Sequence, residues 1–180
     1  MKELSLNKAF TLLEPGPVTL ITTSDLGKPN IMTLSWHIVL EFSGPFGIMT
    51  GPWNYSYQAL MKNKECVINI PGIDLIDKVV GVGTTTGSET DKFKTFNLTP
   101  TQAASVSCPI IKECMAAIEC RVVDHIKKYD LIILDPANAW AKSDYKRQQA
   151  FHYRGDGTFI ADGERFNYRK EMSSKLAPGV

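Results

Sequence analysis

The stretch that most constrains the fold is Asn30–Lys64, NIMTLSWHIVLEFSGPFGIMTGPWNYSYQALMKNK. Residues 30–41 alternate in the manner of a long β-strand, and a second short strand, Phe46–Thr50, follows the turn at Gly44-Pro45. Tyr55–Asn63 then places apolar residues at helical spacing. Strands that succeed one another through a tight turn predict antiparallel pairing, because a parallel pair needs a much longer connection.

The two faces of strand 30–41 differ in character. One face is wholly apolar, so we predict that it packs in the core. The other face mixes small hydroxyl side chains into a strand surface, which lets a flat ligand approach the backbone closely. The apolar face carries Met32, Leu34, Trp36 and Ile38. The mixed face carries Ile31, Thr33, Ser35, His37 and Val39.

The helix over Tyr55–Asn63 supplies a second binding feature. Asn54 precedes it as a candidate N-cap, and the backbone amides of Ser56 and Tyr57 in its first turn are suited to receiving an anion. A flat polar strand face beside an anion site is the combination that a flavin mononucleotide (FMN) requires, because FMN joins a planar ring to a phosphate.

Short strands and short helices alternate through the rest of the chain. Tight turns connect the strands, so the pattern predicts a mainly β (α+β) fold, an antiparallel Greek-key barrel with short helices in the connections, rather than a doubly wound sheet. The length suits one domain over residues 1–180. Further strands are expected at Val18–Ser24, Glu65–Ile70, Met115–Ile126 and Asp130–Leu134, helices at Leu4–Leu13 and Ile73–Val80, and a helical turn at Asp91–Phe96. A last hairpin is expected between Thr158–Ala161 and a partner around 165–168, and residues 137–145 match no clear pattern.

Composition excludes several classes of protein. The formal net charge is +1 and the basic residues are scattered, which argues against nucleic-acid binding. No segment reaches the roughly 18 uninterrupted apolar residues of a membrane span, and residues 1–10 lack the apolar core of a signal peptide. Four cysteines in a chain of this size do not indicate a disulfide scaffold. These features predict a cytoplasmic protein without a membrane partner.

Three other patterns carry weaker hypotheses. The run Gly81–Gly87, GVGTTTG, loosely resembles a dinucleotide fingerprint, but it follows a helical pattern and lacks an acidic residue about 20 positions later. Such a Gly/Thr-rich loop with many backbone amides can still line an anion site. Cys108, Cys114 and Cys120 are spaced more widely than zinc ligands, so no metal site is expected. Lys92 is either a solvated residue at a helix start or the cation for a phosphate bound by the preceding loop.

Four blocks of this sequence, in the same order, resemble the flavin reductase-like family of FMN-binding split barrels, and most closely its flavoredoxin branch. Together they cover most of residues 15–125, and the resemblance thins beyond Asp130. The blocks are Asn30–His37 (NIMTLSWH), Tyr55–Pro71 (YSYQALMKNKECVINIP), Thr86–Pro100 (TGSETDKFKTFNLTP) and Ile110–Val122 (IIKECMAAIECRV).

The resemblance implies a homodimer with FMN near the subunit interface and its ring against the MTLSW strand. The backbone amides of Thr33–Trp36 would meet the edge of the ring. Chemistry would reside in the flavin, so no catalytic side chain is expected. The implied cofactor-binding residues are Met32, Thr33, Leu34, Ser35, Trp36, Thr50, Asn54, Tyr55, Ser56, Tyr57, Gly87, Ser88 and Lys92.

The chain departs from the family pattern at three places. Related proteins often carry arginine where this chain has Asn54 and Ser88, so two cations that would hold a phosphate are absent. The Gly-Asp-His signature of two-component reductases is replaced by Lys128-Tyr129-Asp130-Leu131. The two missing arginines predict weaker or exchangeable FMN binding, and the missing Gly-Asp-His signature argues against reduction driven by NADH or NADPH.

Two classes of function follow. The first is an FMN-binding redox protein, either a flavin reductase that uses NADH or NADPH or a flavoredoxin-type electron carrier with a redox partner. The second is a non-catalytic split-barrel module that binds a flavin, haem or another small ligand.

Overall fold

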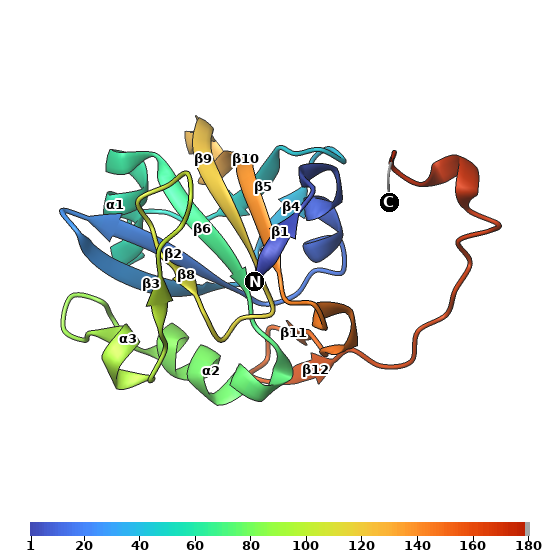
Figure 1. Ribbon diagram of the computed structural model, residues 1–180. Helices are drawn as coiled ribbons and strands as arrows, with labels where there is room; N and C mark the ends of the chain where they lie inside the picture. The colour runs from blue at the N-terminus through green and yellow to red at the C-terminus, as the bar shows by residue number, and fades with distance from the viewer. Residues whose placement is uncertain (179–180) are drawn as a thin grey trace.

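The computed structural model describes residues 1–178, and its main element is a curled antiparallel sheet (Figure 1). The strand order is β3-β2-β6-β9-β10-β5-β4, and β1 pairs with β10. These strands are β1 (Lys2–Leu4), β2 (Thr19–Asp25), β3 (Lys28–Leu34), β4 (His37–Val39), β5 (Phe46–Met49), β6 (Glu65–Ile70), β9 (Ala116–Ile126) and β10 (Leu131–Ala141). Two small sheets pair β7 (Pro100–Thr101) with β8 (Ile110–Ile111) and β11 (Phe151–Tyr153) with β12 (Phe159–Ala161).

Short helices fill the connections, as the sequence predicts. The α-helices are α1 (Tyr55–Asn63), α2 (Ile76–Thr84) and α3 (Lys92–Thr95). The 3-10 helices are η1 (Leu6–Leu12), η2 (Ile73–Leu75), η3 (Lys127–Tyr129), η4 (Tyr145–Arg147) and η5 (Ser173–Lys175). No helix in the described part of the chain combines the length and the apolar content needed to cross a bilayer.

One extended segment joins the two edges of the main sheet. β3 lies at one end of the strand order and β4 at the other, yet only Ser35 and Trp36 separate them in sequence. The sheet must therefore curl until its two edges approach each other, which produces a split barrel. This closure places the Ser35–Trp36 junction at the seam of the barrel.

Two apolar clusters hold the curled sheet in place. β2 is buried along most of its length because its two faces enter different clusters. Ile21 packs in the cluster that includes Leu60 of α1, and Leu20 packs in the cluster that includes Val79 of α2. Since neighbouring residues of a strand point to opposite faces, α1 and α2 cover opposite sides of β2.

The predicted apolar face of strand 30–41 is only half correct. Met32 and Leu34 are buried, but Trp36 and Ile38 expose 66% and 51% of their surface. The prediction for these last two is wrong because the strand breaks at Ser35–Trp36. Beyond the break the chain forms β4, which pairs with β5 alone at the edge of the sheet.

Helix α2 extends four residues beyond the predicted end at Val80. Gly81 lies against the ring of Phe96, and an added Cβ at Gly83 would come within 3.3 Å of Thr33. The Thr33 hydroxyl also donates to the Val79 carbonyl at 2.7 Å. This close packing outweighs the low helix propensity of glycine, so the helix continues where a loop was expected.

The C-terminal part differs most from the sequence prediction. β12 pairs with β11, and not with residues 165–168, because Gly155 and Gly157 adopt φ values of +85° and +87° and turn the chain back on itself. β10 continues through residues 137–141. Its Pro136 lies at a register shift against β9, a bulge where a proline is tolerated within a sheet.

Glu119 of β9 is a fully buried carboxylate in an otherwise apolar strand segment. It accepts hydrogen bonds from the amides of Ala104 (3.0 Å) and Ser105 (2.6 Å) and from Trp140 Nε1 (2.7 Å). Although burial by itself raises it, the pKa of Glu119 lies below its usual value because of these bonds. The carboxylate therefore ties the 104–105 loop to the sheet.

We expect Glu119→Gln to lower the free energy of unfolding by about 1–3 kcal/mol, because an amide cannot accept all of these bonds and leaves buried donors unpaired. Urea denaturation at neutral pH measures this change. Glu164→Gln, at an exposed position, is the matched control. Equal stability of the two variants would contradict the structural role of Glu119.

Candidate functional site

The Ser35–Trp36 junction leaves two backbone amides without a partner. The β2–β3 ladder ends at Leu34 and the β4–β5 ladder begins at His37. The Trp36 carbonyl accepts a bond from Met49 N at 2.9 Å, but no acceptor among residues 1–178 takes the N–H of Ser35 or Trp36. Backbone donors are normally paired within a sheet, so this seam is a place where an external acceptor can bind.

A polar cavity of about 280 Å³ lies along β3. It is bounded by β3, the start of α1, the end of α2 and the loop before α3. The structure brings together here seven of the residues predicted to bind the cofactor. They are Met32, Thr33, Asn54, Tyr55, Ser56, Gly87 and Lys92.

The start of α1 offers backbone amides to this cavity, but they are not the two amides that the sequence predicts. Asn54 occupies the N-cap position, but its side chain donates to Thr50 Oγ1 at 3.0 Å and does not cap the helix. The Tyr57 amide donates to the Asn54 carbonyl. The N–H groups of Tyr55 and Ser56 therefore remain without an acceptor in the described chain, and these two, rather than Ser56 and Tyr57, can bind an anion.

The loop before α3 closes over the cavity at Gly87. A Cβ at this position would clash with Asn30 Oδ1 and would lie 2.7 Å from the ring of Tyr55. Only glycine allows the loop to come this close to β3 and α1. The neighbouring hydroxyls of Thr86 and Ser88 are hydrogen-bonded to each other at 2.9 Å.

Lys92 provides a buried cation in the cavity wall. Its side chain is nearly inaccessible, at 6% exposure, and its amine donates to the carbonyls of Ile31 and Val82, both at 2.9 Å. Burial lowers the pKa of Lys92 to about 8, so the amine is mostly protonated at neutral pH. No carboxylate forms an ion pair with it in the described residues. An anionic ligand would supply the missing opposite charge.

A second, more apolar cavity of about 370 Å³ adjoins the first. The two share Thr33, Gly83 and Thr84 in their walls. The second cavity is also lined by Val18, Ser35, Val79, Val80, Tyr153, Gly157 and Phe159. The pair forms a trough with one polar end at α1 and one apolar end at the β11–β12 hairpin, a division that suits a ligand with a phosphate and an aromatic ring.

The other predicted residues lie around the trough but not in its polar end. Leu34 belongs to the core, and Thr50 is buried behind Asn54. Tyr57 packs near the ring of His125, 6.0 Å between centroids. Ser88 lines a neighbouring cavity with Gly87. Trp36 is exposed at the seam.

Some wall residues are absent from the predicted set. Asn30 links β3 to α1 by donating to Ser56 Oγ at 2.8 Å. The segment 82–86 contributes most of one wall, and it belongs to the Gly/Thr-rich run 81–87 for which the sequence leaves an anion-site role open. The hairpin residues Tyr153 and Phe159 carried no such signal, because they lie far from the trough in sequence.

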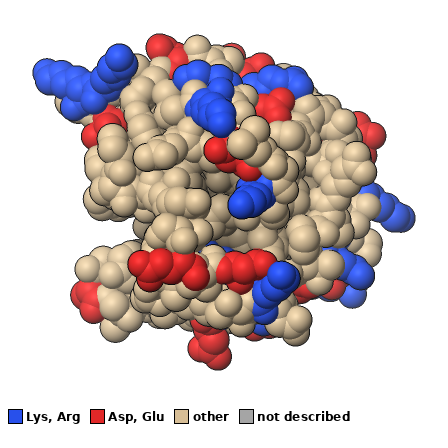
Figure 2. Space-filling view, turned by 90° about the vertical axis from the view of Figure 1, so that its left-hand side faces the viewer, with Lys and Arg blue, Asp and Glu red and all other residues tan. Residues whose placement is uncertain are grey.

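The face of the molecule that carries α1 and α3 is hollowed. Figure 2 shows this hollow bordered mostly by uncharged side chains, with acidic groups gathered on one side. Among the described residues that line the polar cavity, Lys92 is the cationic one. An anion bound there would meet backbone amides and Lys92.

Comparison with known proteins identifies the family of this chain. Residues 12–160 match the model of the flavin reductase like domain. An uncharacterized protein of Archaeoglobus fulgidus is 34% identical over 113 residues, which span 62% of this chain and 64% of that protein.

Two solved structures have similar folds. An FMN-binding domain of a flavin reductases-like enzyme from Shewanella baltica superimposes with a TM-score of 0.85 at 22% identity, over 92% of this chain and 96% of that one. The flavoredoxin of Desulfovibrio vulgaris gives a TM-score of 0.79 at 21% identity, over 84% of this chain and 89% of that one.

The split-barrel topology expected from the sequence is thus confirmed by the structure and by these neighbours. The matched region includes the β3–β4 seam, α1, α2 and the loop before α3. On this basis the chain belongs to the flavin reductase like domain family.

Proposed function

We propose that this protein binds FMN in the trough and uses it as a redox cofactor. The observation that carries the proposal is that the amides of Ser35 and Trp36 have no acceptor in the described chain. They lie beside the trough, which is polar at one end and apolar at the other. Family membership and the FMN-binding neighbours support it.

Each part of the trough has a role in this proposal. The Tyr55 and Ser56 amides and the Lys92 amine hold the phosphate, and the ribityl chain crosses over the contact between Thr33 and Gly83, which both cavities share. The Ser35 and Trp36 amides donate to the polar edge of the ring, while Val18, Val79 and Phe159 exclude water from its side. When bound, FMN supplies reversible electron transfer. Donors fixed at the ring edge favour the reduced, anionic form.

Two redox roles are compatible with this site. A flavin reductase accepts hydride from NADH or NADPH, whereas a flavoredoxin-type carrier exchanges electrons with a protein partner. Asn54 and Ser88 add no cation to the phosphate end, so we expect FMN to exchange with solvent rather than to be held permanently.

The visible spectrum of the purified protein, after addition of FMN and gel filtration, tests cofactor binding. Anaerobic titration with NADH and NADPH then separates the roles: rapid bleaching of the flavin identifies a reductase, and reduction only by dithionite identifies a carrier. A haem spectrum, or no affinity for FMN, would refute the proposal and favour a module for another ligand.

We also expect a homodimer that covers the exposed apolar residues at the seam. Trp36, Ile38 and Phe42 lie close together in sequence and each exposes about half of its surface or more, and exposed apolar side chains that form a patch mark interaction surfaces. Light scattering of the FMN-loaded protein should give twice the mass of one chain. Ile38→Glu should shift the mass toward the monomer, while Val123→Glu, at a similarly exposed residue of β9, should not. A monomeric parent protein would refute the dimer.

A further inference from the structure

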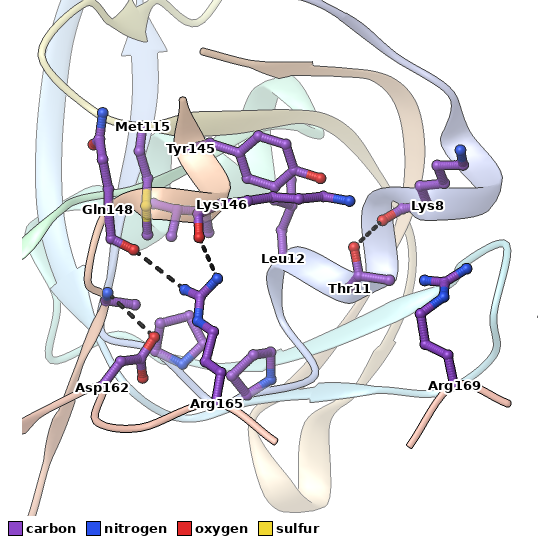
Figure 3. Close-up of a pocket in the computed structure, with 14 residues that line it drawn as sticks. Lys8, Thr11, Leu12, Met115, Tyr145, Lys146, Gln148, Asp162, Arg165 and Arg169 are labelled. Atoms are coloured by element: carbon purple, nitrogen blue, oxygen red, sulfur yellow. Dashed lines mark hydrogen bonds between the residues drawn. The ribbon is translucent and has the colours of Figure 1, made fainter. Parts of the chain in front are cut away.

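A cavity of about 570 Å³, larger than either half of the trough, lies on another part of the molecule (Figure 3). It is enclosed by η1, the η4 turn and the segment that follows β12. None of the residues that line it also lines the trough. Its volume falls within the range of about 300–1,000 Å³ that is usual for small-molecule sites.

The floor of this cavity is apolar. Leu12, Ile70, Met115 and Ala150 are each at most 6% exposed and belong to the main core cluster. The ring of Tyr145 forms part of the wall, and Figure 3 shows it beside Lys146, above Leu12. A ligand that reaches this floor must present an apolar body to it.

The rim, in contrast, is strongly basic. Among the described residues, Lys8, Lys146, Arg165 and Arg169 line the cavity together with one carboxylate, Asp162. This concentration of positive charge is local, because the whole chain carries a formal net charge of only +1. Lys8, Lys146 and Arg165 form no ion pair in the described residues.

Asp162 forms no ion pair with Lys8, Lys146 or Arg165 in the described residues. Asp162 Oδ1 contacts His152 Nε2 at 2.8 Å, and Oδ2 accepts a bond from the Ala150 amide at 3.3 Å. Figure 3 shows Asp162 turned toward this amide and away from Lys8 and Arg169.

Arg165 is held in place at the centre of the rim. Its guanidinium donates to the carbonyls of Lys146 and Gln148, as Figure 3 shows. Carbonyls orient the group but leave its charge uncompensated. A planar guanidinium fixed in this way is well suited to binding a carboxylate, sulfonate or phosphate.

We propose that this cavity is a second ligand site, distinct from the flavin trough, that binds a small amphipathic anion: an apolar, ring-sized body joined to a carboxylate, sulfonate or phosphate. The body packs on Leu12, Ile70 and Met115, and the anionic group contacts Arg165 and Lys146. Neither a neutral apolar molecule nor a free inorganic anion satisfies both the floor and the rim.

Isothermal titration of the FMN-saturated full chain with naphthalene-1-sulfonate tests the proposal. We expect one binding event per chain. Arg165→Gln and Lys146→Gln should each weaken it roughly ten- to a hundredfold, the range for a lost charge-assisted hydrogen bond. The neutral analogue naphthalene-1-methanol should bind the parent more weakly than the sulfonate does. Its affinity for the two variants should equal its affinity for the parent. Lys112→Gln, an exposed lysine that lines neither site, is the matched control.

Two variants keep the test decisive. Arg165 also anchors the segment after β12, so its loss can displace that segment. The Lys146 amine lies 5.9 Å from the centroid of the Tyr145 ring and makes no hydrogen bond in the described chain, so Lys146→Gln removes the charge with little effect on the fold. Unchanged binding in Lys146→Gln, equal affinity for the neutral analogue, or full displacement by equimolar inorganic phosphate would each overturn the proposal. An absence of binding would overturn it as well. FMN binding measured on the same variants should be unchanged, so this test is independent of the proposed redox function.

Discussion

Ser35→Leu should abolish FMN binding while the protein remains folded. Ser35 lies at the seam of the barrel, is only partly buried and lines the apolar half of the trough. A leucine side chain would fill the space that the flavin ring requires, and the adjacent amides would be covered. We expect the dissociation constant for FMN to rise at least about a hundredfold, or roughly 2.7 kcal/mol, in titrations that follow flavin fluorescence.

Ser35→Ala distinguishes the contribution of the backbone amides to FMN binding from the contribution of the Ser35 side chain. It preserves the Ser35 and Trp36 amides and enlarges the cavity slightly, so FMN affinity should remain within a fewfold of the parent value. Ser143→Leu, at an exposed position away from the trough, controls for added apolar surface. If Ser35→Leu bound FMN as tightly as the parent protein, the ring would not lie against this seam.

The seam itself shows how far the sequence determines the site. Alternation in residues 30–41 correctly predicts that Met32 and Leu34 face the core and that small hydroxyl residues face a cavity. The break after Leu34 is a consequence of barrel closure, because the same segment must serve two opposite edges of one sheet. Local periodicity contains no information about that closure, so the exposure of Trp36 and Ile38 was missed.

Packing between residues far apart in sequence also determines where α2 ends and which residues form the apolar wall of the trough. Two glycines at 81 and 83 indicate a loop when propensity alone is considered, yet Phe96 and Thr33 pack directly against them. The hairpin that places Phe159 and Tyr153 at the apolar end follows the trough's other residues by more than 60 positions. The family resemblance indicates β3, α1 and the loop at Gly87 as candidate cofactor-binding elements. It gives no indication of the basic cavity at Arg165, because the resemblance thins beyond Asp130.

Lys92→Met should weaken FMN binding and also change its dependence on pH. The substitution removes the buried cation found among the described residues of the polar cavity, while keeping a side chain of similar length. We expect a loss of about 1.5–3 kcal/mol in FMN affinity at neutral pH, the scale for hydrogen bonds to charged groups. Riboflavin, which lacks the phosphate, should bind the variant and the parent almost equally.

The pH dependence has a definite sign. In the ligand-free protein the pKa of Lys92 is about 8, so its charge disappears as the pH rises through this value. FMN affinity of the parent should therefore decrease above about pH 8, and that of Lys92→Met should remain flat over the same interval. Riboflavin titrations across the same range correct for effects on the flavin ring.

The stability of the ligand-free protein should change in the opposite direction. Between about pH 8 and the usual lysine value of 10.5, the unfolded chain binds a proton at Lys92 that the folded chain has lost. Stability therefore rises with pH in this window, by at most about 3.4 kcal/mol for a shift of this size. The same rise should be absent in Lys92→Met.

Comparing the two measurements assigns the role of Lys92. A loss of FMN affinity with no loss for riboflavin, together with the missing rise in stability, means that the buried ammonium faces the phosphate. Equal losses for both ligands would mean instead that Lys92 maintains the trough through its bonds to the Ile31 and Val82 carbonyls. In that case the amides of Tyr55 and Ser56 would be left to bind the phosphate alone, since Asn54 and Ser88 carry no charge.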